Sequence, residues 1–196
     1  MTDPKPYALV DASDSLLAII DVQGTFLNKL PPEEQNRVLN NICWLAKVAA
    51  WKGIPLVVTA EELDREPPVE ALFQALPADT PIFNKMIFGL ADQPNILEAV
   101  EHTGRRTAVL VGLETDVCIM HSALGLLERG FRAVVVTDAT ASPAPGHQLG
   151  LDRMRSAGVV LLSMKGLFYE WLRDVETVQR FHREQPDMRE QAGIIL

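Results

Sequence analysis

The sequence predicts a three-layer α/β fold, Rossmann-like, with a mostly parallel β-sheet flanked by helices. Short apolar runs rich in β-branched residues alternate with longer stretches of helical periodicity, which is typical of repeated βα units. The runs are nearly continuous in apolar character, as expected of strands that helices cover on both faces. The predicted strands cover residues 16–21, 55–59, 107–112, 133–138 and 159–163, and residues 81–84 form a further short strand or extended segment.

The predicted helices fill the intervals between these strands. The first covers residues 33–52, in which Val38, Ile42, Leu45 and Ala49 share the face that packs on the sheet. A glycine follows each of four helices and tolerates the positive φ of a helix end. These glycines are Gly53, Gly104, Gly130 and Gly158, and the later helices are predicted over residues 95–103, 116–129, 147–157 and 167–180.

Composition restricts the class of protein. With 196 residues, 47% of them hydrophobic, we expect one domain over residues 1–196, with a core from about 15 to 171 and a C-terminal helical tail over 172–196. The net charge of −8 argues against a nucleic-acid partner. Residues 1–14 do not resemble a signal peptide, and no apolar run is long enough for a membrane span, so we expect no membrane partner and a cytoplasmic location.

Two tryptophans indicate a partner surface. Trp44 and Trp51 lie seven residues apart on the first helix, away from its sheet-facing stripe. We therefore expect a homo-oligomer. The alternative is that both rings pack under a neighbouring loop.

Three residues at strand ends or loops carry candidate chemistry. Asp21 ends the first strand, Cys118 begins the helix after the 107–112 strand, and Lys85 lies between them in the chain. A helix N-terminus favours a thiolate, so we expect a lowered pKa and a reactive thiol at Cys118. A nearby carboxylate can accept the thiol proton as a general base, and a lysine can stabilise the thiolate.

Four segments resemble the isochorismatase-like cysteine hydrolase family, which includes nicotinamidases, N-carbamoylsarcosine amidohydrolase and ureidoacrylate amidohydrolase. They are LLAIIDVQGTF, KMIFG, VGLETDVCIM and VVVTDATAS, and the resemblance extends over roughly residues 15–171. It implies that Asp21, Lys85 and Cys118 form a catalytic triad.

The resemblance also implies the surroundings of the triad. It places a non-proline cis peptide between Leu113 and Glu114, and an oxyanion hole at the N–H groups of Glu114 and Cys118. The pocket-lining, substrate-binding residues are expected to be Gln23, Phe26 and Phe88.

The expected function is hydrolysis of a C–N bond in a small amide, ureido or carbamoyl compound through a cysteine thioester. We expect no cofactor and no metal, because the TAEELDR stretch lacks the histidines of the nicotinamidase metal cluster. Alternatives are a non-catalytic or redox-sensing thiol protein and, among enzymes, a metal-dependent nicotinamidase. A dyad of Cys118 with His121 has only the i+3 spacing in its support and is not expected. His147 either reaches the pocket mouth, caps its helix or is simply exposed. Asp138 is expected to orient a loop and Cys43 to be structural.

Overall fold

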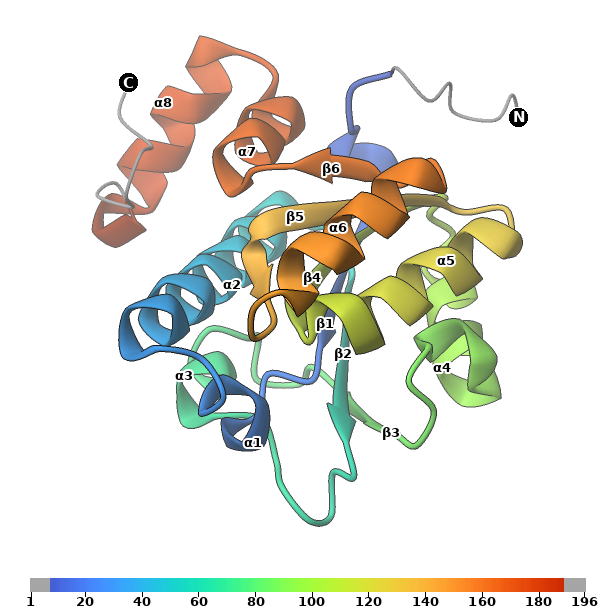
Figure 1. Cartoon of the computed structure of the whole chain (residues 1–196). Helices are drawn as coiled ribbons and strands as arrows, with labels where there is room; N and C mark the ends of the chain where they lie inside the picture. The colour runs from blue at the N-terminus through green and yellow to red at the C-terminus, as the bar shows by residue number, and fades with distance from the viewer. Residues whose placement is uncertain (1–7, 189–196) are drawn as a thin grey trace.

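A six-stranded, all-parallel β-sheet lies between two layers of helices in the computed structural model, which describes residues 8–188 (Figure 1). The three-layer α/β prediction is confirmed, and each predicted strand is present. The strands are β1 (Ser15–Ile20), β2 (Leu56–Glu61), β3 (Ile82–Lys85), β4 (Thr107–Leu113), β5 (Arg132–Ala141) and β6 (Val160–Leu162). Of the predicted tail, residues 189–196 lie outside the described part of the chain.

Helices cover both faces of the sheet, which explains why the strands are apolar along their whole length. The helices are α1 (Gly24–Leu27), α2 (Pro32–Lys52), α3 (Glu70–Phe73), α4 (Pro94–His102), α5 (Met120–Glu128), α6 (Gly146–Ser156), α7 (Met164–Leu172) and α8 (Val175–Glu184). On β1, Leu17 and Ile19 join the core cluster that includes α2, α7 and α8, whereas Leu16, Ala18 and Ile20 join the cluster that includes α4, α5 and α6. All six β1 residues are buried.

The prediction of one continuous helix over residues 167–180 is wrong. The chain breaks at Arg173, whose φ of 69° is incompatible with a right-handed helix. The Asp174 side chain then accepts a hydrogen bond from the Thr177 backbone N–H and caps α8. Two helices therefore occupy the predicted interval, and α8 folds back on the first long helix (Figure 1).

The tryptophans are covered by this C-terminal segment, so their interpretation as a partner surface is wrong. They pack within the chain, as the alternative expected, but under a helix and not under a loop. Trp44 is only 5% exposed, and its indole N–H donates to the Met188 carbonyl at 3.1 Å. The Trp51 indole N–H donates to Glu184 on α8 at 2.8 Å. Phe181 of α8 packs against both rings, with centroid distances of 6.1 and 5.1 Å.

In the strand order β3-β2-β1-β4-β5-β6, the chain adds β2 and β3 on one side of β1 and then adds β4, β5 and β6 on the other side. The point where the strand order reverses therefore lies between β1 and β4. In open parallel sheets, ligands bind at the carboxyl ends of the strands beside such a reversal. Gly112 lets these two strands approach closely there, because a Cβ at this position would lie 1.9 Å from the Ile20 carbonyl oxygen. Within residues 8–188, no helix has the length and apolar character needed to cross a membrane.

Candidate active site

Asp21 lies directly after β1 and is held in a constrained conformation. Its φ is 52°, in the left-handed region that few non-glycine residues adopt. The backbone N–H of Asp21 donates to the Thr59 carbonyl, and the Thr59 hydroxyl donates to the Asp21 carboxylate at 2.9 Å. The carboxylate is therefore fully buried and fixed from both its backbone and its side chain.

Lys85, at the end of β3, joins Asp21 to Cys118. Its ammonium lies 2.9 Å from the Asp21 carboxylate and 3.5 Å from the Cys118 sulfur. It also donates to the Ile87 carbonyl at 3.2 Å, and its side chain is completely buried. The structure thus brings together the three residues expected as the triad from three separate strand ends.

Cys118 lies in a π-helical turn over Thr115–Ile119 that precedes α5. Contacts with β5 and the residue after it fix this turn. Ser142 donates to the Asp116 carboxylate at 2.6 Å, and the hydroxyls of Thr115 and Thr140 lie 3.0 Å apart. Gly150 of α6 packs so closely that a Cβ there would lie 2.8 Å from the Asp116 Cα. The nucleophile turn is therefore held rigidly by β5 and α6.

The expected lowering of the Cys118 pKa is wrong. Burial, followed by the negative charge of Asp21, raises the pKa of the Cys118 thiol to about 12, although Lys85 opposes this. Burial also raises the pKa of Asp21, against the effect of the Lys85 ammonium. The resting thiol is therefore protonated, and its proton must move when the nucleophile attacks.

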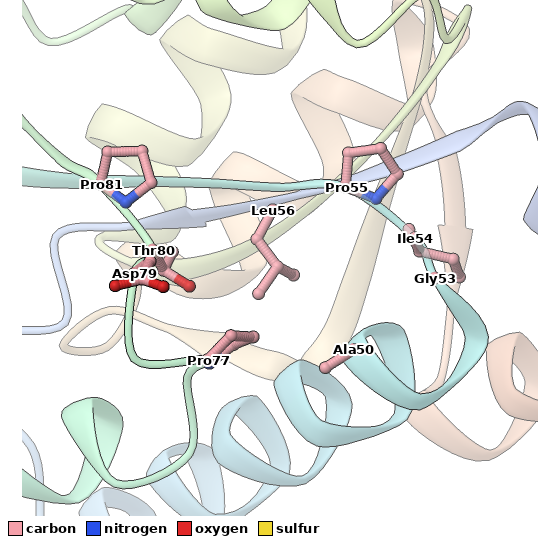
Figure 2. A pocket seen from close by; sticks show the side chains of 9 residues that line it. All are labelled: Ala50, Gly53, Ile54, Pro55, Leu56, Pro77, Asp79, Thr80 and Pro81. Atoms are coloured by element: carbon pink, nitrogen blue, oxygen red, sulfur yellow. The ribbon is translucent and has the colours of Figure 1, made fainter.

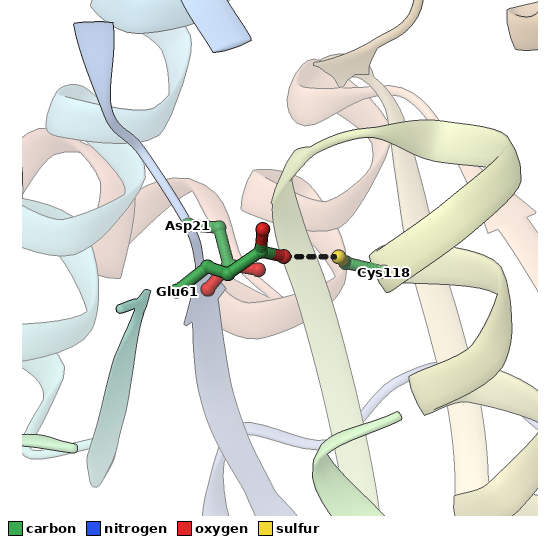
Figure 3. Close-up of side chains that lie close together, drawn as sticks. All are labelled: Asp21, Glu61 and Cys118. Atoms are coloured by element: carbon green, nitrogen blue, oxygen red, sulfur yellow. Dashed lines mark hydrogen bonds between the residues drawn. The ribbon is translucent and has the colours of Figure 1, made fainter. Parts of the chain in front are cut away.

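Glu61, at the end of β2, is a fourth ionisable residue of this site that the sequence analysis missed. One carboxylate oxygen of Glu61 faces the Cys118 sulfur (Figure 3), at a distance of 3.8 Å. The same oxygen lies 3.9 Å from the Lys85 ammonium. Glu61 pairs with Lys85 in the β2–β3 register, so the two side chains belong to one edge of the sheet. Its position at the carboxyl end of a predicted strand was the signal that could have identified it.

A metal could be considered at this cluster, because the donor atoms of Asp21, Glu61 and Cys118 lie within 4.8 Å of one another. It is the one group of three possible metal-ligand residues within residues 8–188, and it contains no histidine. The Lys85 ammonium already contacts the same donor atoms and supplies the positive charge there. The donor set and the buried cation therefore do not suit a catalytic divalent metal.

Gln23 does not offer its side-chain amide to a ligand. The amide nitrogen donates to the backbone carbonyls of Glu61 and Glu66 at 2.8 and 2.6 Å, and the amide oxygen accepts from the Glu61 N–H at 2.9 Å. Gln23 is 1% exposed. It holds the backbone of Glu61 in place, instead of lining the pocket as expected.

The two phenylalanines expected in the pocket differ in their surroundings. Phe26 is partly buried against the core, with the Lys29 ammonium 4.9 Å from its ring centroid. Phe88 is 53% exposed and packs edge-on against His121, with centroids 6.0 Å apart. His121 is itself exposed and turned to this ring, so the geometry does not favour a dyad with Cys118.

His147 supports the nucleophile turn from behind. Its Nδ1 lies 2.9 Å from the Thr115 hydroxyl, and burial lowers the pKa of the imidazole. The neutral His147 ring therefore positions Thr115 in the nucleophile turn. This contact is what the structure shows for a residue whose place at the pocket mouth was one of several expectations. Asp138 accepts from the Met164 N–H at 2.7 Å and orients the start of α7, as expected.

The expected non-proline cis peptide between Leu113 and Glu114 is present. Glu114 precedes the π-helical turn, and its carbonyl accepts from the N–H groups of Val117 and Ile119. The Glu114 side chain forms an ion pair with Lys29 at 3.0 Å.

A separate groove, with a volume of about 420 Å³, lies at the other end of the sheet. It is lined by the end of α2, the start of β2 and the segment before β3, including Ala50, Leu56 and Pro81 (Figure 2). Leu56 begins β2 whereas Glu61 ends it, so the groove lies at the amino ends of the strands and the triad at their carboxyl ends. The groove is unrelated to the catalytic candidates.

Residues 15–165 match the isochorismatase domain family. The chain is 29% identical to the probable hydrolase YcaC of Escherichia coli over 194 residues, which cover 94% of this chain and 93% of that protein. The crystal structure of E. coli YcaC, an octameric hydrolase of unknown specificity, is similar with a TM-score of 0.79 and 26% identity, covering 95% of each chain. YcaC of Pseudomonas aeruginosa, with hexane-2,5-diol and covalent acrylamide, has the same TM-score and identity over 93% of this chain and 94% of its own.

Proposed function

This chain belongs to the isochorismatase family, and we propose that it is a cysteine amidohydrolase that cleaves a C–N bond of a small amide, ureido or carbamoyl compound. The observation that carries the proposal is the buried cluster in which Lys85 contacts both Asp21 and Cys118, at 2.9 and 3.5 Å. A base, a cation and a thiol in one dry site are the components of covalent acyl transfer.

In the proposed acylation, the Cys118 thiol gives its proton to Asp21 while the sulfur attacks the substrate carbonyl carbon. The carbonyl electrons move to oxygen, where the N–H groups of Glu114 and Cys118 would act as the oxyanion hole. As the C–N bond breaks, protonated Asp21 returns the proton to the leaving nitrogen. Lys85 keeps Asp21 oriented and balances the negative charge at each stage.

Deacylation repeats the sequence with water. Asp21 takes a proton from the water that attacks the thioester carbonyl, and the tetrahedral intermediate then expels the sulfur, which recovers that proton. The acid product leaves, or its carbamic acid form where the substrate is a ureido compound. No step needs a cofactor, since the base, the acid and the nucleophile of acylation are side chains of this chain and the nucleophile of deacylation is water.

The alternatives fit this site less well. A redox-sensing cysteine needs a low pKa and solvent access, whereas Cys118 has a pKa raised to about 12 and is 2% exposed. A metal-dependent nicotinamidase needs histidine ligands, whereas the donor group of Asp21, Glu61 and Cys118 contains none and the Lys85 ammonium contacts it. We therefore propose that the enzyme works without a metal and that Phe26 and Phe88 contact the substrate.

We also propose that residues 1–196 act as one hydrolase domain and that the protein is a cytoplasmic homo-oligomer with a small-molecule substrate, without nucleic-acid or membrane partners. Support for the oligomer comes from the octameric E. coli relative, because the tryptophan argument no longer applies.

Ammonia release from a panel of amides, ureides and carbamoyl amino acids tests the proposal. For any substrate found, Cys118→Ala should remove nearly all turnover, and an acyl adduct on Cys118 should be trapped by acid quenching and mass spectrometry. Cys43→Ala is the matched control, since Cys43 bonds to the Ala71 carbonyl on the helical surface away from the triad. A Cys118→Ala variant with the wild-type rate would disprove the mechanism.

A further inference from the structure

Glu61 has no task in the proton transfers proposed above, yet its backbone is held unusually firmly. Gln23 bonds to both its N–H and its carbonyl, and the N–H of the following residue, Glu62, donates to the Lys85 carbonyl. Its side chain, by contrast, is 28% exposed. One carboxylate oxygen accepts a hydrogen bond from the Cys118 thiol at 3.8 Å and lies 3.9 Å from the Lys85 ammonium, and the Asp21 carboxylate is within 4.8 Å. The fold fixes the main chain of Glu61 and leaves its partly exposed carboxylate beside the Cys118 sulfur.

The charges of the site show what this carboxylate adds. Asp21 and Cys118 together carry one negative charge wherever their shared proton lies, and Lys85 balances that charge. The oxyanion formed during attack takes over this same charge when Asp21 holds the proton. Glu61 is therefore an excess negative charge in the resting state and throughout the reaction.

We propose that Glu61 is a specificity-determining residue, which makes the site accept neutral or cationic acyl compounds with N–H groups beside the scissile carbonyl and reject compounds with a nearby carboxylate. The inference rests on the proposed amidohydrolase function and names its substrate class. A carbon bonded to the Cys118 sulfur has its substituents within reach of the Glu61 carboxylate. An N–H of the leaving nitrogen can donate to Glu61, which leaves the nitrogen lone pair free to take the proton from Asp21.

Primary amides and ureido compounds with uncharged or basic substituents meet these requirements. An N-carbamoyl amino acid, whose carboxylate lies close to the ureido group, does not. Butyramide, succinamate and 4-aminobutyramide provide a matched test series, because they share the scissile CONH₂ group and differ in the charge at the other end.

The test uses alkylation of Cys118 by two small reagents of opposite charge, iodoacetate and 2-bromoethylammonium. The rate at the Cys118 peptide is followed by mass spectrometry and divided by the rate with free cysteine, which removes the intrinsic difference between the reagents. Removing the Glu61 charge also lowers the pKa of Cys118 and speeds both reactions, so the ratio of the two normalised rates is the diagnostic quantity. This ratio does not depend on any hydrolysis.

We expect Glu61→Gln to reduce the preference for the cationic reagent by roughly tenfold. The two reagents differ by two charge units, and each interacts at short range with the partly exposed carboxylate that the substitution removes. Glu61→Asp keeps the charge and should retain most of the preference. Glu62→Gln is the matched control: this neighbouring carboxylate pairs with Arg65 and should leave the ratio at the wild-type value.

A Glu61→Gln ratio within twofold of the wild type overturns the inference, as does faster hydrolysis of succinamate than of butyramide by the wild-type enzyme. A charge-dependent ratio in a protein that hydrolyses nothing in the panel would instead support the role of Glu61 and count against the proposed amidohydrolase. The two ideas therefore fail separately.

Discussion

Asp21→Asn should separate the reactivity of the thiol from the activity of the enzyme. The Asp21 carboxylate lies within 4.8 Å of the Cys118 sulfur and is one cause of the raised thiol pKa. At that distance and an effective dielectric constant of about 20, two unit charges interact by about 3.5 kcal/mol. Removing the charge should increase the acid dissociation constant of the thiol by roughly 400-fold. Asparagine is nearly isosteric and tolerates the left-handed φ of 52° at this position.

A less basic thiolate is also a weaker nucleophile, which cancels about half of the logarithmic gain and leaves a roughly 25-fold faster alkylation. The assay is the iodoacetamide rate at the Cys118 peptide near pH 8, beside ammonia release from the best substrate. We expect the first to rise and the second to disappear, because no base or acid remains. Asp92→Asn, at an exposed carboxylate of the 3₁₀ turn before α4, is the control. Unchanged or slower alkylation in Asp21→Asn would show that Asp21 does not keep the thiol protonated.

Three variants and two changes of condition test the remaining assignments. Lys85→Met leaves the buried Asp21 unpaired and should lower the free energy of unfolding by about 3–5 kcal/mol in urea titrations at pH 7; a loss below 1 kcal/mol would contradict a buried ion pair. The pKa of Lys85 is raised above 10.5, mainly by Asp21 against the opposing effect of burial, so its stabilisation is present below pH 10.5 and is lost as the pH rises through the folded-state value. Wild-type stability should accordingly fall more steeply at alkaline pH than that of Lys85→Met. Trp44→Ala should cost about 3–5 kcal/mol and Trp51→Ala less, measured in the same way, because only Trp44 is nearly fully buried. Exhaustive chelation should leave hydrolysis intact, and chelator-sensitive turnover restored by one metal would revive the nicotinamidase alternative.

The fold could be predicted well because the sheet is covered on both faces. Each strand is then an apolar run with a clear beginning, and positive φ values at Gly53, Gly104, Gly130 and Gly158 mark the predicted helix ends. The break at Arg173 was missed because the periodicity of residues 167–180 contains no glycine or proline there. The Asp174 cap could have indicated it, since Asp is a preferred N-cap residue at a helix start.

The tryptophan error has a different cause. Helical spacing shows that Trp44 and Trp51 share one side of α2, but it does not show what covers that side. The cover is Phe181 and the end of α8, about 130 residues further along the chain. An apolar face on a predicted helix therefore indicates only that something packs there, and the partner can be the same chain.

For the site, the sequence identified the residues at strand ends, but their electrostatics depend on burial. Gln23 and Glu61 illustrate this: the residue expected to contact substrate holds the backbone, and the one left aside lies beside the sulfur. The Cys118 pKa was misjudged because the helix N-terminus and Lys85 were considered without the desolvation of the thiol. Desolvation is the largest cause of the shift, and no local pattern reveals how deeply a strand end is buried.

A raised thiol pKa is compatible with catalysis when the base is raised with it. Burial shifts the pKa of Asp21 and of Cys118 in the same direction, so the proton transfer between them is less uphill than it would be from a buried thiol to an exposed carboxylate. The thiolate exists only while a carbonyl carbon is there to accept its electron pair, and the protonated carboxyl is then a competent acid for the leaving nitrogen. The proton moves within the Asp21–Cys118 pair, so the pair keeps one negative charge throughout the transfer, and the Lys85 ammonium contacts both residues and balances that charge. The same burial that makes Cys118 a slow target for alkylation therefore makes Asp21 a better acid–base group for amide cleavage.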